Sequence, residues 1–246
     1  MKKFTWLLAV MLVVLLVAGM GLAAKPVLRV GTDATYEPFE TIDTNGAFVG
    51  FDMDFMRMVA DTAGMELKLM NIGWDGIIPG LSNGNYDCLI SAMTITSERK
   101  KQINFTTPYF SIRQAIVVKS DNKKISGAED LIGKTVTVQN GTTGDLFASK
   151  IKDIKMKRFD TNPQAIQELL NNNADASVMD DLVAFNAVKK TPGLKVIAIK
   201  GAEKEDYGIG VKKGNDALLA KLNKAIDTLQ KNGKLAALVA KYKSAK

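Results

Sequence analysis

Short apolar runs alternate with amphipathic segments along the first half of the chain. Runs bounded by turn residues predict strands at residues 27–31, 67–72 and 86–93. Apolar side chains at helical spacing, such as Phe51, Phe55 and Val59, predict helices at residues 50–63, 74–81 and from about Ser97. This βαβαβ order predicts a parallel sheet with helices on both faces.

The second half repeats the pattern after residues 108–114 interrupt it. Strands are expected at residues 115–119, 134–139, 154–159, 175–179 and 194–199. Helices are expected between them at residues 144–152, 163–171 and 181–189. One more strand at 207–211 and two helices at 215–230 and 234–242 finish the chain. The second half therefore resembles a second doubly wound unit.

The fold class expected from this pattern is α/β, with two doubly wound lobes joined by a two-strand hinge. Residues 24–110 and 206–246 would form lobe 1, and residues 111–205 lobe 2, each near the usual size of a domain. The last strand and helices are too short for a third domain, so they are expected to pack on the first lobe. Two crossovers at one edge would act as a hinge, and the cleft between the lobes would hold the ligand.

Residues 1–23 have the character of a secretory signal. Lys2 and Lys3 precede an apolar run that ends in small residues, and cleavage after Ala23 leaves Gly21 and Ala23 at the small-residue positions. Cleavage after Ala24 is less consistent with this rule, because it would place Leu22 at one of those positions. The alternative is an uncleaved membrane anchor, for which the run is just long enough.

Composition excludes several chemistries. The 246 residues include no His and a single Cys, Cys88. A Ser-His-Asp triad, a His-ligated zinc site and an intramolecular disulfide are therefore impossible. Lys and Arg number 33 against 26 Asp and Glu, but they are spread along the chain, which argues against a nucleic-acid groove.

Polar and aromatic side chains follow the predicted strands, where ligands of open α/β sheets bind. These are Asp33, Tyr36, Trp74, Thr94, Arg99, Thr143 and Asp180. An arginine with a helix N-terminus suits a carboxylate, and an aspartate suits an ammonium group. Taken singly, each residue also has a structural explanation. Asp180 could cap a helix, Arg99 could belong to a solvated run of charges, and Trp74 could be a core or rim residue. The combination at successive strand ends favours a site for a zwitterion.

Five motifs resemble the conserved blocks of periplasmic polar amino-acid-binding proteins. The clearest is Gly50-Phe-Asp-Met-Asp-Phe55. The others are Val30-Gly-Thr-Asp-Ala-Thr-Tyr-Glu-Pro-Phe39, Trp74-Asp-Gly-Ile-Ile-Pro79, Thr94-Ile-Thr-Ser-Glu-Arg-Lys-Lys101 and Val138-Gln-Asn-Gly-Thr-Thr143. Glutamine-, arginine- and lysine/arginine/ornithine-binding proteins belong to this family. The resemblance implies a type II periplasmic binding protein that delivers an L-amino acid to an ABC permease in the inner membrane.

The resemblance also implies a role for each site residue. Arg99 would clamp the ligand's α-carboxylate with Thr143 and the Ala92 backbone, and Thr94 and Asp180 would hold its α-ammonium. Tyr36 and Trp74 would sandwich its side chain, Asp33 would contact its polar end, and Gln139 stands where the family varies with the ligand. A periplasmic monomer without cofactor, metal or catalytic residue is expected.

Two other functions remain possible from the sequence. Secreted enzymes share this scaffold, so a cyclohexadienyl dehydratase-like lyase is the alternative. A receptor's sensory domain is a third, although no membrane segment or signalling domain follows residue 24. An acid at Asp33 beside two aromatic rings and the Gln139 amide favours arginine or glutamine as ligand, since a planar guanidinium or amide stacks on rings and pairs with a carboxylate.

Overall fold

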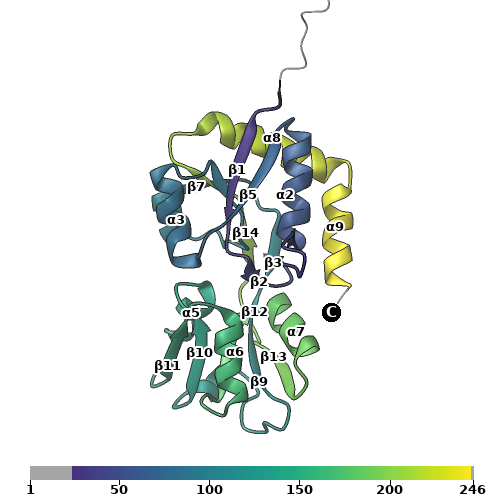
Figure 1. The fold of residues 1–246 in the computed structure, drawn as a ribbon. Coiled ribbons are helices and arrows are strands. Elements are labelled where there is room, and N and C mark those ends of the chain that lie inside the picture. Colours follow the sequence, from purple (N-terminus) through teal and green to yellow (C-terminus); the bar gives the residue numbers. More distant parts are fainter. Residues whose placement is uncertain (1–23, 245–246) are drawn as a thin grey trace, which may run out of the picture.

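The computed structural model describes residues 24–244, which form two lobes stacked end to end (Figure 1). Each lobe is a five-stranded sheet with helices packed against it, so the predicted α/β fold class is confirmed. The expected signal segment, residues 1–23, lies outside the described residues. Within residues 24–244, no helix combines the length and apolar character needed to cross a membrane.

The first sheet has the strand order β5-β1-β6-β15-β7. Its strands are β1 (Val27–Thr32), β5 (Glu66–Asn71), β6 (Cys88–Leu89), β7 (Ile103–Phe105) and β15 (Gly210–Lys212). Strand β1 runs parallel to β5 and β6, whereas β15 runs antiparallel to β6 and β7. The sheet is therefore mixed and not wholly parallel as predicted, because the chain returns from the other lobe to add β15.

Helices cover this sheet on two sides (Figure 1). They are α2 (Phe51–Thr62), α3 (Trp74–Asn83), α4 (Ser97–Gln102), α8 (Asp216–Lys231) and α9 (Lys234–Lys243). Neighbouring residues of β6 face opposite clusters: Cys88 packs with the α2 side of the core and Leu89 with the α3 side. Cys88 is a buried free thiol.

The second sheet has the order β11-β10-β12-β9-β13. Its strands are β9 (Gln114–Lys119), β10 (Thr135–Gln139), β11 (Lys155–Phe159), β12 (Ala176–Asp180) and β13 (Leu194–Ala198). They are covered by η1 (Ala128–Leu131), α5 (Thr143–Ala148), α6 (Asn162–Leu170) and α7 (Asp181–Lys190). The apolar run of β9 is buried on both faces, with Val117 toward α6 and α7 and Ile116 toward α5. Strand β9 is antiparallel to both of its neighbours, so this sheet is also mixed.

A two-stranded antiparallel ribbon joins the lobes. Strand β8 (Phe110–Ile112) leads into the second sheet and pairs with β14 (Glu205–Tyr207), which leads back. The predicted two-strand hinge is thereby confirmed, and residues 108–114, which interrupt the sequence pattern, contain one of its strands. The predicted strand at 207–211 is two strands, since the chain passes from the ribbon into the first sheet at Gly208 and Ile209.

A small sheet that the sequence pattern did not predict lies where the lobes meet. It consists of β2 (Thr35–Tyr36), β3 (Glu40–Ile42) and β4 (Phe48–Val49). Gly50 follows it with a φ of 124°, and a side chain there would collide with the Phe39 carbonyl group. Only glycine fits this close approach, and the approach starts α2 directly beneath the small sheet.

Candidate ligand-binding site

A cavity between the two sheets is lined by all nine residues predicted from the sequence. The lining residues are Asp33, Tyr36, Glu40, Trp74, Ser91, Ala92, Thr94, Arg99, Gln139, Thr142, Thr143 and Asp180. Most of them stand at or just beyond the carboxyl ends of strands. Asp33 follows β1, Gln139 ends β10 and Asp180 ends β12. Parallel strands from each lobe thus point their carboxyl ends at one space, where open α/β sheets bind ligands.

Arg99 is a nearly buried cation at this cavity, with 7% of the residue exposed. The Thr96 hydroxyl caps α4 by accepting from the Arg99 N–H, which fixes the backbone from which the side chain extends. The guanidinium donates to the Thr94 carbonyl at 2.8 Å and to the Gly141 carbonyl at 3.2 Å, and it lies 5.1 Å from the Trp74 ring centroid. Burial lowers its pKa from the usual value. None of the ion pairs formed within residues 24–244 includes Arg99, although the Asp180 and Glu205 carboxylates are near enough to raise its pKa against the larger effect of burial.

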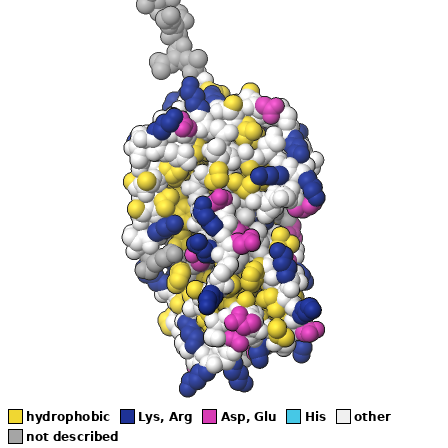
Figure 2. Space-filling view, turned by 180° about the vertical axis from the view of Figure 1, so that it is seen from behind, with side chains coloured by type: hydrophobic (Ala, Val, Ile, Leu, Met, Phe, Trp, Pro, Cys, Tyr) yellow, Lys and Arg dark blue, Asp and Glu magenta, His cyan; other side chains and the backbone are white. Residues whose placement is uncertain are grey.

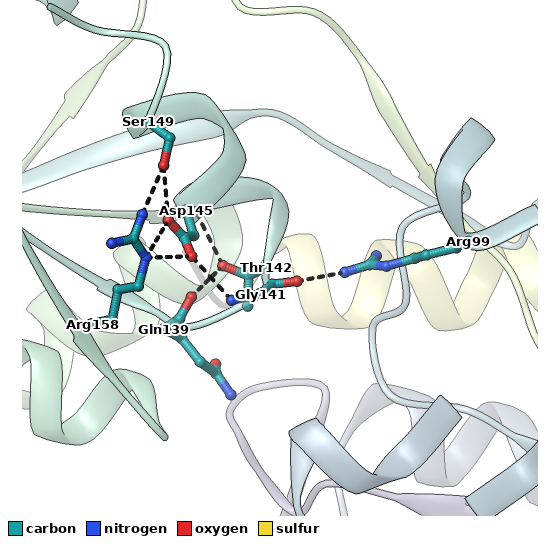
Figure 3. A network of polar contacts seen from close by, with 7 residues as sticks. All are labelled: Arg99, Gln139, Gly141, Thr142, Asp145, Ser149 and Arg158. Carbon is teal, nitrogen blue, oxygen red and sulfur yellow. Dashed lines mark hydrogen bonds and ion pairs between the residues drawn. The ribbon is translucent and has the colours of Figure 1, made fainter. Parts of the chain in front are cut away.

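The turn opposite Arg99 is held by a network of hydrogen bonds (Figure 3). The Asp145 carboxylate accepts from the Gly141 N–H at 3.1 Å and pairs with Arg158. The Thr142 hydroxyl donates to the Gln139 carbonyl and accepts from the Asp145 N–H. These bonds place the start of α5, with Thr143, beside Arg99. A helix N-terminus next to a buried guanidinium favours an anion.

Asp180 is a buried carboxylate whose oxygens accept three hydrogen bonds. Gln114 Nε2 donates at 2.6 Å, the Tyr36 hydroxyl at 2.8 Å, and the Tyr207 hydroxyl makes the third. Burial raises the pKa of Asp180 to about 6, although the tyrosine hydroxyls act in the other direction. Asp180 therefore carries most of its negative charge at neutral pH.

Asp33 lies at another part of the cavity wall and is 4% exposed. It accepts from the Thr35 hydroxyl at 2.9 Å and from Gln139 Nε2 at 3.4 Å. Burial raises the pKa of the Asp33 carboxyl above its usual value, and these hydrogen bonds only partly offset the effect. Because Gln139 also donates to the Asp160 carbonyl, its amide nitrogen is fixed toward the protein.

The expected role of the Ala92 backbone needs a correction. The Ala92 N–H donates to Asp52 Oδ2 at 2.7 Å, so it is not free to bind a ligand carboxylate beside Arg99. The carbonyl is the remaining backbone group of Ala92, and a carbonyl accepts hydrogen bonds from ammonium groups. The predicted strand 86–93 is also shorter than expected, because Ala92 turns the chain with a φ of 45°.

Sequence reasoning missed several polar residues that contact the predicted ones, among them Ser91 in the cavity wall, which accepts from the Asp33 N–H. Gln114, the first residue of β9, bridges Asp180, Thr143 and Glu205, and Glu205 on β14 accepts from Thr94 Oγ1 at 3.3 Å. Glu205 lies in the β8–β14 ribbon, and Gln114 follows β8 closely. Their only sequence signal was that they lie at the predicted two-strand hinge.

Charge and metal chemistry add little to this site. Figure 2 shows Lys and Arg scattered among acidic side chains over the rear face of both lobes. Across residues 24–244, no three His, Cys, Asp or Glu side chains are grouped so that they could hold a metal ion. The site's chemistry therefore comes from three buried acids (Asp33, Glu40 and Asp180), one buried guanidinium, hydroxyl groups and an indole ring.

Two sheet lobes, a two-strand connection and an interlobe cavity define the type II periplasmic binding protein fold. The model of the bacterial extracellular solute-binding proteins, family 3, matches residues 28–245, and the chain belongs to that family. The resemblance read from the motifs is thereby confirmed.

Named relatives and solved structures agree with this assignment. The probable histidine-binding protein of Neisseria gonorrhoeae is 36% identical over 228 residues, covering 89% of this chain and 85% of that protein. An ancestral arginine-binding protein bound to arginine is 43% identical, with a TM-score of 0.85 over 89% of this chain and 99% of the other; the same protein has also been solved bound to glutamine. An ancestral amino acid-binding protein described as a precursor of cyclohexadienyl dehydratase is 38% identical, with a TM-score of 0.82 over 88% and 95% of the two chains. These proteins are described as binding proteins.

Proposed function

We propose that this protein captures a polar or basic L-amino acid, arginine or glutamine, in the interlobe cavity and delivers it to an ABC importer. The observation that carries the proposal is that a buried cation, Arg99, and a buried carboxylate, Asp180, line the same cavity. Arg99 is a buried cation that belongs to none of the ion pairs within residues 24–244, and Asp180 is a buried carboxylate. A zwitterion supplies the complement to both charges, and buried charges need such partners.

The α-carboxylate would bind the Arg99 guanidinium with Thr143 and the N-terminus of α5. The α-ammonium would bind Asp180, Thr94 Oγ1 and the Ala92 carbonyl. This orientation points the side chain toward Asp33, Gln139 and the rings of Trp74 and Tyr36. We assign residues 24–110 and 206–246 to one lobe and 111–205 to the other, so the ligand would touch both lobes and favour their closure.

Binding without turnover is part of the proposal. An enzyme needs an acid or base directed at the reacting bond. Asp180 is engaged by three donors, Asp33 by Thr35 and Gln139, and Glu40 by Ser91, so each of the three cavity acids is held by hydrogen bonds within the protein. We place the protein as a monomer in the periplasm, secreted through cleavage of residues 1–23, with the permease in the inner membrane as its partner.

Asp33→Asn should separate the two candidate ligands. A guanidinium needs the carboxylate charge, whereas a glutamine amide can donate to a neutral amide oxygen equally well. We expect the variant to lose arginine affinity about 10- to 100-fold, the cost of leaving a charged hydrogen-bonding group without its ion partner, and to keep glutamine affinity within a few-fold. Isothermal titration calorimetry with both ligands measures this difference. Equal losses for both ligands would mean that Asp33 does not meet the side chain.

A further inference from the structure

Two buried acids are packed against each other at the cavity: one lines its wall and the other lies behind it. Glu40 in β3 and Asp52 in the first turn of α2 are both 0% exposed. Asp52 belongs to the Gly50–Phe55 motif, and nothing in the proposed ligand contacts explains why a buried acid stands there. The Asp52 N–H donates to the carbonyl of Phe39, the residue before Glu40, at 2.9 Å, and the two side chains are close enough for each to affect the other's pKa.

One oxygen of each acid has no other partner. Glu40 Oε2 and Asp52 Oδ1 are buried and receive no hydrogen bond from any donor in residues 24–244. Two facing carboxylates would repel each other in a medium of low polarity. A proton on one of them removes a charge and supplies the donor that both oxygens lack.

The surroundings decide which acid carries that proton. Asp52 Oδ2 accepts from the Ala92 N–H at 2.7 Å and from the Tyr109 hydroxyl at 2.8 Å, and it sits at the start of a helix. Both features stabilise a carboxylate. Glu40 accepts one bond, from the Ser91 hydroxyl at 3.0 Å. Burial and the Asp52 charge raise the pKa of Glu40 well above its usual value, and burial raises the pKa of Asp52 to about 7.

The pair holds the backbone that carries the ligand site. Ser91 Oγ donates to Glu40 and accepts from the Asp33 N–H at 2.9 Å, so Glu40 fixes Asp33 through Ser91. Asp52 fixes the N–H of Ala92, whose φ of 45° is uncommon outside glycine. The pair therefore positions Asp33, which would contact the ligand's side chain, and Ala92, whose carbonyl would bind its α-ammonium.

We propose that Glu40 and Asp52 share one proton, held by Glu40 and donated from Oε2 to Asp52 Oδ1, and that this pair positions Asp33 and Ala92 for ligand binding. The positioning role rests on the proposed function, whereas the shared proton does not. The other titratable groups facing the pair are Asp33, Tyr36 and Tyr109. None of these three groups is a cation, so none of them can replace the proton.

Infrared spectroscopy tests the proton directly. At pH 8 the wild-type protein should show the C=O stretch of a protonated carboxylic acid, since Asp180 with a pKa of about 6 is then ionised. Glu40→Gln should remove the band. Asp54→Asn is the matched control, because Asp54 is the other acid of the motif and pairs with Arg57 and Lys241 at the surface; it should leave the band in place. A wild-type protein without the band at pH 8 would overturn the proposal.

Amide variants test the positioning role. Glu40→Gln and Asp52→Asn each replace one acid by a neutral group that donates a hydrogen bond, so each mimics the shared proton and should lose only a few-fold in arginine and glutamine affinity. The double variant places two amide N–H groups face to face. It should lose about 10- to 100-fold in affinity, the cost of buried unsatisfied donors, and far more than the product of the two single losses.

Calorimetry measures the ligand affinities of the wild type, the two single variants and the double variant. The melting temperatures of the same four proteins complete the double-mutant cycle. Additive losses, or a single variant as weak as the double, would overturn the positioning role. If the wild-type and Asp54→Asn proteins bind no amino acid, the proposed function fails. The infrared band and the double-mutant cycle in melting temperature then still decide whether the proton is shared.

Discussion

Replacing Arg99 with alanine will abolish useful binding of every amino acid. The ligand carboxylate would enter a closed cavity without its counter-charge, and breaking a buried ion pair costs about 3–5 kcal/mol. At about 1.4 kcal/mol per factor of ten, affinity should fall by at least roughly 100-fold. Arg99→Lys should also bind poorly, because an ammonium group replaces neither the bidentate fork nor the contact with the Trp74 ring.

Calorimetry with arginine and glutamine measures this loss, and Arg57→Ala is the control. Arg57 lies on α2, its side chain is 45% exposed, and it pairs with Asp54. That variant should bind as the wild type does. Near wild-type affinity in Arg99→Ala would show that the carboxylate binds elsewhere.

Replacing Asp180 with asparagine will remove both affinity and its pH dependence. Asparagine still accepts from Tyr36, Tyr207 or Gln114, but it offers no charge to the α-ammonium, so binding should weaken by roughly 100-fold. In the wild type, the free protein takes up a proton at Asp180 below a pKa of about 6, and a bound ammonium would lower that pKa. Affinity should therefore fall as the pH drops through 6.

Glutamine is the ligand for this measurement, because its uncharged side chain makes no ion pair with Asp33. Binding constants from pH 5 to 8 should slope for the wild type and stay nearly level for Asp180→Asn. An equally steep slope in the variant would assign the titration to another group.

Much of the fold could be predicted because its signals are local. The helical spacing of Phe51, Phe55 and Val59 gave α2 within a residue or two, and the apolar run of β9 reflects burial on both faces. What the sequence missed depends on distant partners or on very short elements. The two-strand hinge was predicted but the bounds of β8 and β14 were not, because these strands pair with each other across 95 residues of chain. Strands β2 to β4 were missed because they are too short to show a period.

The positions of the candidate site residues could also be predicted, because the carboxyl ends of parallel strands meet at one edge of a sheet whichever side chains follow them. What the sequence could not provide was the hydrogen bonding. Nothing in the letters around Ala92 indicates that Asp52 occupies its N–H, or that Tyr36 donates to Asp180 from the other lobe. Buried acids such as Glu40 look like ordinary polar positions until the packing around them is known.

The most direct test of amino-acid capture uses the emission of Trp74. In protein that begins at Ala24, Trp74 is the only tryptophan, and its ring lies at the cavity against Arg99. Titration with arginine, glutamine, glutamate and leucine should shift the emission at the lowest concentrations with arginine and glutamine. Glutamate would meet Asp33 as a like charge, and leucine would leave Asp33 buried without a partner. A shift at lower concentration with glutamate or leucine, or no shift with any of the four, would contradict the account.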